Sequence, residues 1–252
     1  MATYSSEVNR KGIILAGGKG TRLHPLTHGT TKALLPVYDK PLLYYPISTL
    51  LKFDIRHILI IGSSEEYIES FKRAVKSIYG VTFMFALQQE AKGLSDAFLV
   101  GEKFIGDSEV SLILGDNIFD GDFPSLNHSN TIYGVKVKNP QDYGVIDIDN
   151  DFGFVKSIVE KPVNPPSDKA VPGLYHFDNS AITKAKSIKP SVRGELEITD
   201  LINMYLQEGK MNVSILPEDM AWFDCGTHDH LLEAGNYVKA IQNRTSRIVG
   251  KV

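Results

Sequence analysis

The chain has 252 residues, enough for one large domain or two small ones with a sizeable core. Hydrophobic residues make up 42% of it, and no apolar run approaches the roughly eighteen residues that a membrane span needs, so a membrane role is not indicated. The net charge of -3 gives no basic field for general nucleic-acid binding, and the single cysteine, Cys225, excludes an internal disulfide and a cysteine-based zinc cage.

The first ten residues, MATYSSEVNR, are polar and lack the apolar stretch of a signal peptide. We therefore expect 1–10 to be a disordered leader and the protein to be cytoplasmic. Residues 11–252 contain no internal repeat, low-complexity tract or linker, and 164–168 is a turn rather than a boundary. We predict a single domain with one lobe over about 11–130, a second over about 131–228 and a C-terminal helix over about 228–245.

The first expected strand, 13–16, has the length and β-branching of a strand that is buried on both faces. The loop after it combines glycines, which let backbone N–H groups approach an anion closely, with cations. The glycines are Gly17, Gly18 and Gly20, and the cations are Lys19, Arg22 and Lys32. This combination indicates phosphate binding, although an ordinary glycine turn is the alternative for the loop taken alone.

Two familiar phosphate motifs do not fit this loop. Gly12 and Gly17 have the spacing of a P-loop, but Gly18 stands where that motif requires lysine. A dinucleotide fingerprint that starts at Gly18 would need its third glycine at Leu23. The loop therefore belongs to neither class.

Strand-like and helix-like segments alternate from 57 to 117, which is typical of a mainly parallel sheet with helices on both faces. The expected strands are 57–62, 81–88 and 110–117. Apolar stripes predict a helix on Ile68, Phe71, Val75 and Ile78, and another on Ala97, Phe98, Gly101, Phe104 and Ile105. Ser63 and Glu66 are spaced as a capping box for the first helix. Asp116 lies near the end of the last strand, on the edge where the glycine loop is expected.

From Thr131 the expected strands are shorter and are joined by Asn, Asp, Gly and Pro turns, which predicts a more mixed sheet. These strands are 131–137, 143–149, 153–161 and 170–178. Helical periodicity returns in two stripes, on Ile198, Leu201, Ile202, Tyr205 and Leu206 and on Leu231, Ala234, Val238 and Ile241.

Several polar motifs stand at strand ends or in loops, where packing alone does not require them. They are Asp116, EKP at 160–162, RGELEITD at 193–200 and WFDCGT at 222–227. Each has an ordinary structural explanation, such as a turn former, a solvated ion pair or a helix cap. Together with the glycine loop they favour a functional site.

These motifs resemble those of the sugar-nucleotide pyrophosphorylases. The matching runs include KGIILAGGKGTRLHPLT, LILGDNIF, DYGVIDID, VEKP, PSVRGELEITDL and AWFDCGTHDHLLEAGNY, and they cover nearly the whole chain in one order. The resemblance implies an α/β, Rossmann-like nucleotidyltransferase fold, with a mainly parallel central sheet flanked by helices and a smaller sugar-side β lobe. It also implies that a nucleoside triphosphate and a sugar 1-phosphate react to a sugar nucleotide and pyrophosphate, with Mg2+.

The resemblance assigns roles to individual residues. Nucleotide contacts are expected from Leu15, Gly17, Gly18, Gly20, Thr21, Arg22, Lys32, Gln88, Gly93 and Asp116. Sugar-phosphate contacts are expected from Tyr143, Gly144, Glu160, Lys161, Val171, Arg193 and Trp222, although core packing is the alternative for the aromatic residues. The catalytic cations would be Arg22, Lys32, Lys161 and Arg193. The Mg2+ ligands would be Asp116 and Asp224, because magnesium prefers oxygen ligands and often uses only one or two carboxylates.

The members resembled most closely use dTTP and glucose 1-phosphate and release dTDP-glucose and pyrophosphate for deoxysugar and polysaccharide synthesis. The alternatives are a UTP-dependent sugar-1-phosphate uridylyltransferase and a non-catalytic nucleotide-sugar sensor. A homo-oligomer, dimer or tetramer, is expected. Because the chain stops at Val252, we also expect it to lack the C-terminal helices of longer members and the second, regulatory nucleotide site that they help to form.

Overall fold

The computed structural model describes residues 9–90, 92–149 and 153–252. Most of the predicted leader therefore lies outside the described residues. Arg10 does not belong to a leader, because it is the first residue of strand β1 and its guanidinium forms an ion pair with Glu109 of the neighbouring strand.

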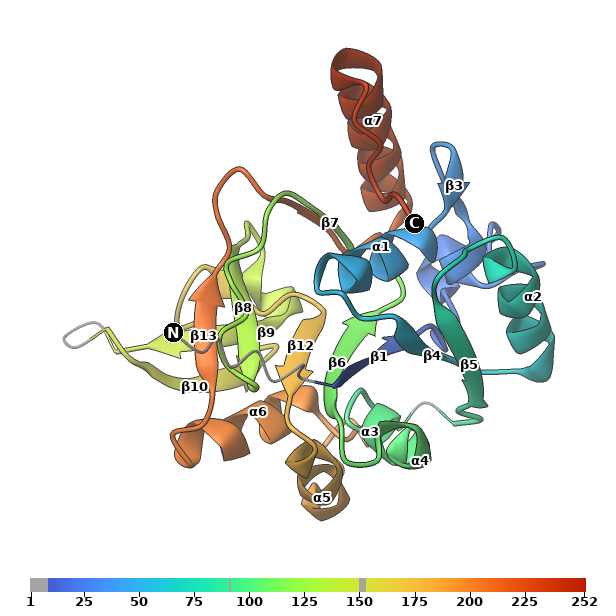
Figure 1. Ribbon diagram of the computed structural model, residues 1–252. Coiled ribbons are helices and arrows are strands. Elements are labelled where there is room, and N and C mark those ends of the chain that lie inside the picture. The colour runs from blue at the N-terminus through green and yellow to red at the C-terminus, as the bar shows by residue number, and fades with distance from the viewer. Residues whose placement is uncertain (1–8, 91, 150–152) are drawn as a thin grey trace, which may run out of the picture.

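A single ten-stranded sheet runs through the molecule (Figure 1). Its order is β10-β9-β11-β8-β12-β6-β1-β4-β5, with β13 paired to β8. The strands are β1 (Arg10–Leu15), β4 (His57–Gly62), β5 (Thr82–Leu87), β6 (Glu109–Leu114), β8 (Thr131–Lys136), β9 (Gly144–Ile148), β10 (Val155–Glu160), β11 (Lys169–Ala170), β12 (Leu174–Phe177) and β13 (Asn212–Ile215).

The half of the sheet built from β6, β1, β4 and β5 is parallel, as the alternating pattern predicted. Leu15, the last residue of β1, stands opposite Ile61 on one side and Leu114 on the other. Parallel strands in this register end together, so the loops that follow them leave from one edge of the sheet. The predicted α/β class is confirmed.

The other half of the sheet is mostly antiparallel. The segment predicted as one strand over 170–178 is interrupted at Pro172, because β11 pairs with β8 and β9 whereas β12 pairs with β6 and β8. Proline donates no backbone hydrogen bond and tends to interrupt a strand. The second lobe is thus an extension of the same sheet, joined through β12.

Helices cover both faces of the sheet. They are α1 (Tyr44–Lys52), α2 (Glu65–Val75), α3 (Asp96–Val100), α4 (Glu102–Ile105), α5 (Ser180–Ser187), α6 (Ile198–Gln207) and α7 (His228–Thr245). Ile13 packs with residues of α3 to α6, and Ile14 packs with residues of α1 and α2, as the two-residue period of a strand requires. Figure 1 shows α3 to α6 along one side of the sheet and α1 on the other.

Two details of the helices differ from the sequence prediction. The N-cap of α2 is Ser64, whose hydroxyl accepts a hydrogen bond from the Tyr67 N–H, and not Ser63. The stripe expected to form one helix is divided into α3 and α4 at Gly101. A Cβ at Gly101 would lie 2.8 Å from the Cδ1 atom of Ile13, so glycine lets the two short helices lie close to β1.

Short elements complete the edge where the parallel strands end. They are the antiparallel pairs β7 (Ile118–Asp120) with β14 (Ala221–Phe223) and β2 (Pro36–Val37) with β3 (Lys40–Pro41), and the 3-10 turns η1 (Thr21–Leu23), η2 (Lys32–Leu34) and η3 (Pro140–Asp142). Helix α7 projects from the body of the molecule in Figure 1. Ala234 and Val238 bury its inner face against a cluster that includes Val37 and Tyr45.

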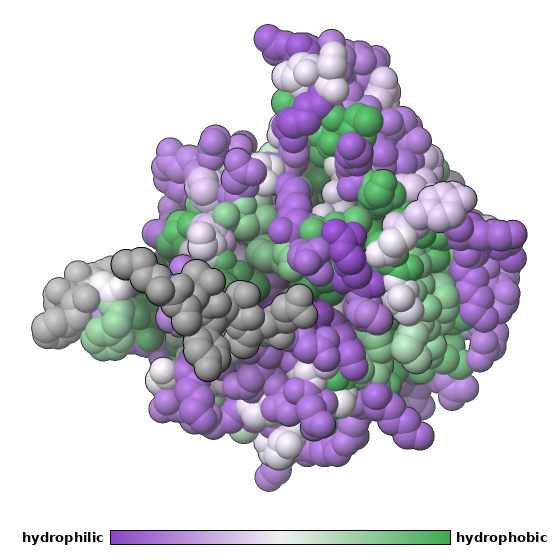
Figure 2. Space-filling model, viewed as in Figure 1, coloured by the Kyte–Doolittle hydropathy of each residue, from purple (hydrophilic) through white to green (hydrophobic). Residues whose placement is uncertain are grey.

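The visible surface is largely hydrophilic, with smaller hydrophobic areas between the polar ones (Figure 2). Among the residues that the structure describes, no helix has both the length and the apolar character needed to span a membrane.

A histidine is buried within the sheet. His176 of β12 has no exposed surface, and its Nδ1 atom lies 2.6 Å from the hydroxyl of Ser111, while its Nε2 atom lies 3.4 Å from the hydroxyl of Tyr133. Burial, together with the positive charge of Arg10, holds the pKa of His176 well below its ordinary range. The folded protein therefore keeps His176 neutral under mildly acidic conditions.

At pH values below about 6.5, the ordinary pKa of histidine, His176 binds a proton in the unfolded chain but not in the folded chain. The free energy of unfolding therefore decreases as the pH falls below that value. We predict that His176→Gln reduces the slope of unfolding free energy against pH between pH 6 and 5 by up to about 1.4 kcal/mol per pH unit. Urea unfolding at several pH values measures this slope. His57→Gln, at an exposed position, should leave the slope unchanged, and an unchanged slope in His176→Gln would contradict the assignment.

Candidate active site

The loops after the parallel strands meet at one edge of the sheet. The Ala16 N–H donates to the Ile61 carbonyl at 2.8 Å, and the Gly115 N–H donates to the Leu15 carbonyl at 2.9 Å. The glycine loop and the segment around Asp116 therefore leave the sheet side by side. Such an edge is where open α/β sheets bind ligands.

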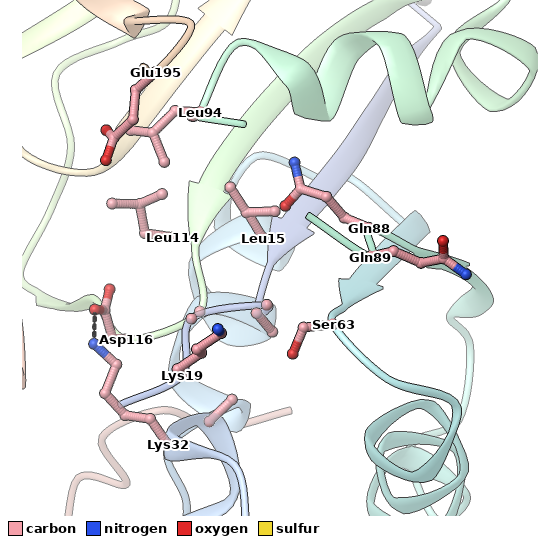
Figure 3. Close-up of a pocket in the computed structure, with 16 residues that line it drawn as sticks. Leu15, Lys19, Lys32, Ser63, Gln88, Gln89, Leu94, Leu114, Asp116 and Glu195 are labelled. Atoms are coloured by element: carbon pink, nitrogen blue, oxygen red, sulfur yellow. Dashed lines mark hydrogen bonds and ion pairs between the residues drawn. The ribbon is translucent and has the colours of Figure 1, made fainter. Parts of the chain in front are cut away.

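The first cavity at this edge has a volume of about 270 Å3 (Figure 3). Its lining residues are Leu15, Ala16, Gly17, Gly18, Lys19, Lys32, Ala33, Ser63, Gln88, Gln89, Gly93, Leu94, Leu114, Gly115, Asp116 and Glu195. Of the residues predicted to contact a nucleotide, Gly20 and Thr21 do not line it, and Arg22 lines the next cavity instead. The other seven all line this first cavity.

The structure gives Gly20 a conformational role. Its φ of 61° lies in the left-handed region, and its carbonyl accepts a hydrogen bond from the Thr27 hydroxyl at 2.8 Å. A Cβ there would lie 3.0 Å from the Cγ2 atom of Thr27. Gly20 therefore turns the chain into η1, which carries Thr21 and Arg22, and shapes the loop without facing the cavity.

Gly93 and the backbone of Leu196 form a tight contact between two loops. Gly93 has a φ of 102°, and a Cβ on it would lie 2.5 Å from both the nitrogen and the oxygen of Leu196. Leu196 donates its N–H to the Lys92 carbonyl at 2.7 Å, and its carbonyl accepts the Ser95 N–H at 3.2 Å. We call this contact the Gly93–Leu196 clamp. It holds the 92–95 segment of the first cavity against the loop that carries Arg193.

The second cavity has a volume of about 200 Å3 and contains most of the predicted sugar-side residues. Its lining residues are Arg22, Leu94, Leu114, Asp116, Asn117, Asp142, Tyr143, Gly144, Glu160, Lys161, Val171, Gly173, Tyr175, Ile198, Thr199, Ile202, Trp222 and Asp224. The two cavities share Leu94, Leu114 and Asp116, so they adjoin each other.

Strand pairing explains how the sugar-side residues meet. Gly144 stands opposite Glu160 in the β9–β10 pair. Just beyond that pair, the Lys161 N–H donates to the Tyr143 carbonyl at 2.9 Å, and the Val171 N–H donates to the Gly144 carbonyl at 2.8 Å. Residues from 143 to 171 are thereby gathered on one wall of the second cavity.

The two acidic residues predicted as metal ligands are brought together by the β7–β14 pair. Phe223 stands opposite Ile118, which places Asp224 beside the Asp116-Asn117 segment. One carboxylate oxygen of Asp224 accepts from the Tyr143 hydroxyl at 3.0 Å, and the other lies 2.6 Å from Nδ1 of His230 on α7. Asp116 forms an ion pair with Lys32 (Figure 3).

Two residues of this site were not singled out from the sequence. Asn117 is almost fully buried, donates to Asp116 at 2.7 Å and accepts from the Trp222 indole N–H at 2.7 Å. His230 holds the second oxygen of Asp224. The position of Asn117 directly after Asp116 was a signal available in the sequence, whereas the contact of His230 depends on how α7 packs.

The predicted catalytic cations differ in their position and in their ion-pair partners. Arg22 and Lys161 both line the second cavity, and neither side chain has a hydrogen bond or ion pair to the described residues. Arg193 lines neither cavity, and instead it contacts Glu160 at 3.2 Å, Glu195 at 3.2 Å and Glu197 at 2.8 Å. Arg22 and Lys161 are therefore available to an anion, while Arg193 is neutralised by carboxylates in this conformation.

The glutamates around Arg193 differ in pKa. Burial and the charge of Glu197 raise the pKa of Glu160, against the opposing effects of Arg193 and Lys161. Burial acts to raise the pKa of Glu197 too, but hydrogen bonds from Arg193 and Ser191 lower it. Glu160 therefore has a raised pKa despite the neighbouring cations, and it lies in the wall of the second cavity.

The acidic residues of the site offer oxygen ligands only. Among the described residues, no group of three or more His, Cys, Asp and Glu side chains could hold a metal ion by itself. Burial and the charges of Asp116 and Asp224 raise the pKa of Cys225, so this thiol is unsuited to act as a thiolate nucleophile. Any bound metal ion would need further ligands from a substrate or water, which is the usual situation of Mg2+.

Taken together, the edge of the sheet carries a cavity with a glycine loop, and an adjoining cavity lined by Arg22 and Lys161 and by the carboxylates of Asp116, Asp142, Glu160 and Asp224. Such an arrangement can hold two anionic molecules with their phosphates close together, because cations and backbone N–H groups offset the repulsion between them.

Comparison with known proteins agrees with this description. The family model for nucleotidyl transferases matches residues 11–240. A glucose-1-phosphate thymidylyltransferase of Neisseria meningitidis is 49% identical over 243 residues, covering 92% of this chain and 84% of the relative. The enzyme of the same name from Mycobacterium tuberculosis strain H37Rv is 43% identical over 245 residues, covering 93% and 84%.

Solved structures give the same result. A Bacillus anthracis protein assigned as a glucose-1-phosphate thymidylyltransferase, crystallised with sucrose, has a TM-score of 0.82 at 37% identity and covers 90% of this chain and 94% of that one. A UDP-glucose pyrophosphorylase in complex with UDP-glucose has a TM-score of 0.79 at 26% identity, covering 92% and 98%. The chain therefore belongs to the nucleotidyl transferase family and is a nucleotidyltransferase.

Proposed function

We propose that the protein transfers a thymidylyl group from dTTP to glucose 1-phosphate, giving dTDP-glucose and pyrophosphate. The observation that carries this proposal is the meeting of the two cavities at Asp116, which would bring the α-phosphate of a nucleotide next to the phosphate of a sugar 1-phosphate. The names of relatives that are 42–49% identical support dTTP and glucose 1-phosphate as the substrates.

In this proposal the first cavity holds dTTP. The base lies against Gln88 and the backbone of Gly93, and the triphosphate follows the glycine loop toward Lys32. Backbone N–H groups near Gly17 and Gly18 approach the phosphates because no side chain intervenes. Arg22, which lines the second cavity and has no side-chain hydrogen bond or ion pair with the described residues, stabilises the charge that builds on the departing pyrophosphate.

The second cavity holds glucose 1-phosphate. Lys161 supplies a point charge to its phosphate, while Glu160 and the walls formed by Tyr143, Val171 and Trp222 contact the sugar. One phosphate oxygen of glucose 1-phosphate attacks the α-phosphorus of dTTP, a new P–O bond forms, and the bond to pyrophosphate breaks. The attacking oxygen is already ionised, so no side chain needs to remove a proton.

Arg193 contributes only after a change of partners. Its guanidinium now contacts three glutamates, and we propose that the incoming sugar phosphate draws it away from Glu160. A bidentate arginine clamp on a phosphate makes two charge-assisted hydrogen bonds, whereas the contact with Glu160 is a single one at 3.2 Å, which favours the exchange.

We propose Mg2+ as the cofactor, held by Asp116 and Asp224. Their carboxylates line the same cavity and are hard oxygen donors, which fits magnesium. When bound, the ion supplies positive charge that polarises the phosphoryl oxygens. Asn117, Tyr143 and His230 hold the two carboxylates in place through the hydrogen bonds described above.

We also propose that the protein forms a homo-oligomer and is cytoplasmic. Leu232 on the projecting α7 is 65% exposed, and Ile248 just after the helix is 54% exposed, which suits a contact between copies in a homo-oligomer. A cytoplasmic location follows from the proposed substrates, which are phosphorylated metabolites.

The substrate assignment is tested by steady-state kinetics with dTTP and UTP, each paired with glucose 1-phosphate and galactose 1-phosphate, while pyrophosphate and the sugar nucleotide are measured. We expect the highest kcat/KM for dTTP with glucose 1-phosphate. A preference for UTP would support the uridylyltransferase alternative. Tight nucleotide binding with no pyrophosphate from any pair would identify a sensor and refute the proposed reaction.

Asp116→Asn and Asp224→Asn should each lower kcat by roughly a hundredfold or more, because an amide keeps the shape of the side chain but offers Mg2+ a weaker, neutral ligand. Activity measured against magnesium concentration should show a higher requirement in each variant. Asp107→Asn, at an exposed position, is the matched control and should behave as wild type. Full activity with an unchanged magnesium requirement would exclude that carboxylate as a ligand.

A further inference from the structure

A carboxylate lies behind the base end of the first cavity and has no role in the reaction proposed above. Asp96 is the first residue of α3 and is 8% exposed. Its side chain has one hydrogen-bond partner among the described residues, the Nε2 atom of Gln88, which donates to Oδ2 of Asp96 at 2.7 Å. Gln88 is likewise 8% exposed and lines the cavity.

This hydrogen bond fixes which end of the Gln88 amide faces the cavity. An ionised carboxylate only accepts hydrogen bonds, so it must receive the NH2 end of the amide. The Oε1 atom is then turned the other way, and it lies 3.6 Å from the position of a Cβ on Gly17, which also lines the cavity. Figure 3 shows the oxygen of Gln88 turned toward Leu15 and its nitrogen turned away. No described residue donates to this oxygen.

A second polar group of the same wall is also fixed. The Gly93 N–H donates to none of the described residues, and the Gly93–Leu196 clamp sets the orientation of its backbone. In the proposed pose of the base, the wall offers one acceptor, Oε1 of Gln88, and one donor, the Gly93 N–H, which has no hydrogen-bond partner among the described residues. A pyrimidine-2,4-dione, thymine or uracil, carries the complementary pair, a donor at N3–H and an acceptor at O4.

We propose that Asp96 is a positioning residue for base selection, which holds the carbonyl of Gln88 toward the base so that the site accepts thymine or uracil and rejects cytosine. Cytosine presents a lone pair at N3 and an amino group at C4, opposite in both places to the wall. This inference rests on the proposed use of dTTP at this cavity. A buried polar pair left unmatched weakens binding by roughly 5- to 150-fold.

The test compares dTTP with 5-methyl-dCTP at saturating glucose 1-phosphate, because these nucleotides differ only at the base edge that Gln88 and Gly93 would contact. The quantity measured is the ratio of kcat/KM for dTTP to that for 5-methyl-dCTP. In Asp96→Asn the new amide can donate as well as accept, so the side-chain amide of Gln88 can rotate by about 180° and exchange its oxygen and nitrogen. We expect the ratio to fall about tenfold, mainly through better use of 5-methyl-dCTP, with the KM for glucose 1-phosphate unchanged.

A double variant that exchanges the amide and the carboxylate of Gln88 and Asp96 distinguishes a positioning role of Asp96 from a packing role. In the double variant Gln88→Glu with Asp96→Asn, the amide of Asn donates to one oxygen of Glu, and the other oxygen faces the cavity as an obligate acceptor. The total charge is the same as in wild type. We expect this variant to reject 5-methyl-dCTP again and to regain most of the wild-type ratio. Asp107→Asn, which removes an exposed carboxylate elsewhere, should leave the ratio unchanged.

The outcomes are distinct. A wild-type ratio in folded Asp96→Asn, or a low ratio in both the single and the double variant, would overturn the role of Asp96, since a helix-start or packing role alters melting temperature and not base choice. If Asp96→Asn does not fold, the double variant decides, with a high ratio in support and a low one against. A wild-type protein that does not turn over dTTP would instead overturn the proposed function itself.

Discussion

The parallel pairing of β1 with β4 and β6 is the constraint on which the site depends. Because Leu15 lies opposite both Ile61 and Leu114, the three strands end at one level, and the glycine loop leaves the sheet beside the segment that carries Asp116. Most of the residues paired in this register, such as Ile13, Ile14 and Ile60, are buried and apolar, so the register is held mainly by the core. The sheet thereby brings the glycine loop and the segment with Asp116 together at one edge.

The two halves of the site are also joined directly, by the Gly93–Leu196 clamp. One side of this contact belongs to the wall of the first cavity, and the other belongs to the loop with Arg193, Glu195 and Glu197. Only glycine fits at position 93, since a φ of 102° and a 2.5 Å approach to another backbone both exclude a side chain. In the proposed reaction, a nucleotide bound against Gly93 would therefore also position the loop that carries Arg193.

Much of this could be predicted from the sequence, because buried strands and striped helices have clear periodicities and the glycine loop and acidic motifs are local patterns. What escaped prediction depends on contacts between distant segments. The break at Pro172 follows from two different strand partners, and Arg193 contacts Glu160, which is 33 residues away in the chain. His230 meets Asp224 only through the packing of α7. Gly20 and Thr21 are predicted nucleotide contacts that do not line the first cavity, and Gly20 forms the left-handed turn into η1. The orientation of the Gln88 amide likewise needed the position of Asp96.

The two cavities, proposed to hold the nucleotide and the sugar phosphate, should act as one unit through the clamp, and Gly93→Ala tests this coupling most directly. Dissociation constants for dTTP and for glucose 1-phosphate, each measured by calorimetry, should both rise by about tenfold or more, because the added Cβ displaces Leu196 and with it the loop of Arg193. Gly106→Ala is the matched control, since its φ of 55° is also positive but no atom lies within 4 Å of the added Cβ. If Gly93→Ala weakened dTTP alone and bound glucose 1-phosphate as wild type does, the two cavities would be independent and the claim would be wrong.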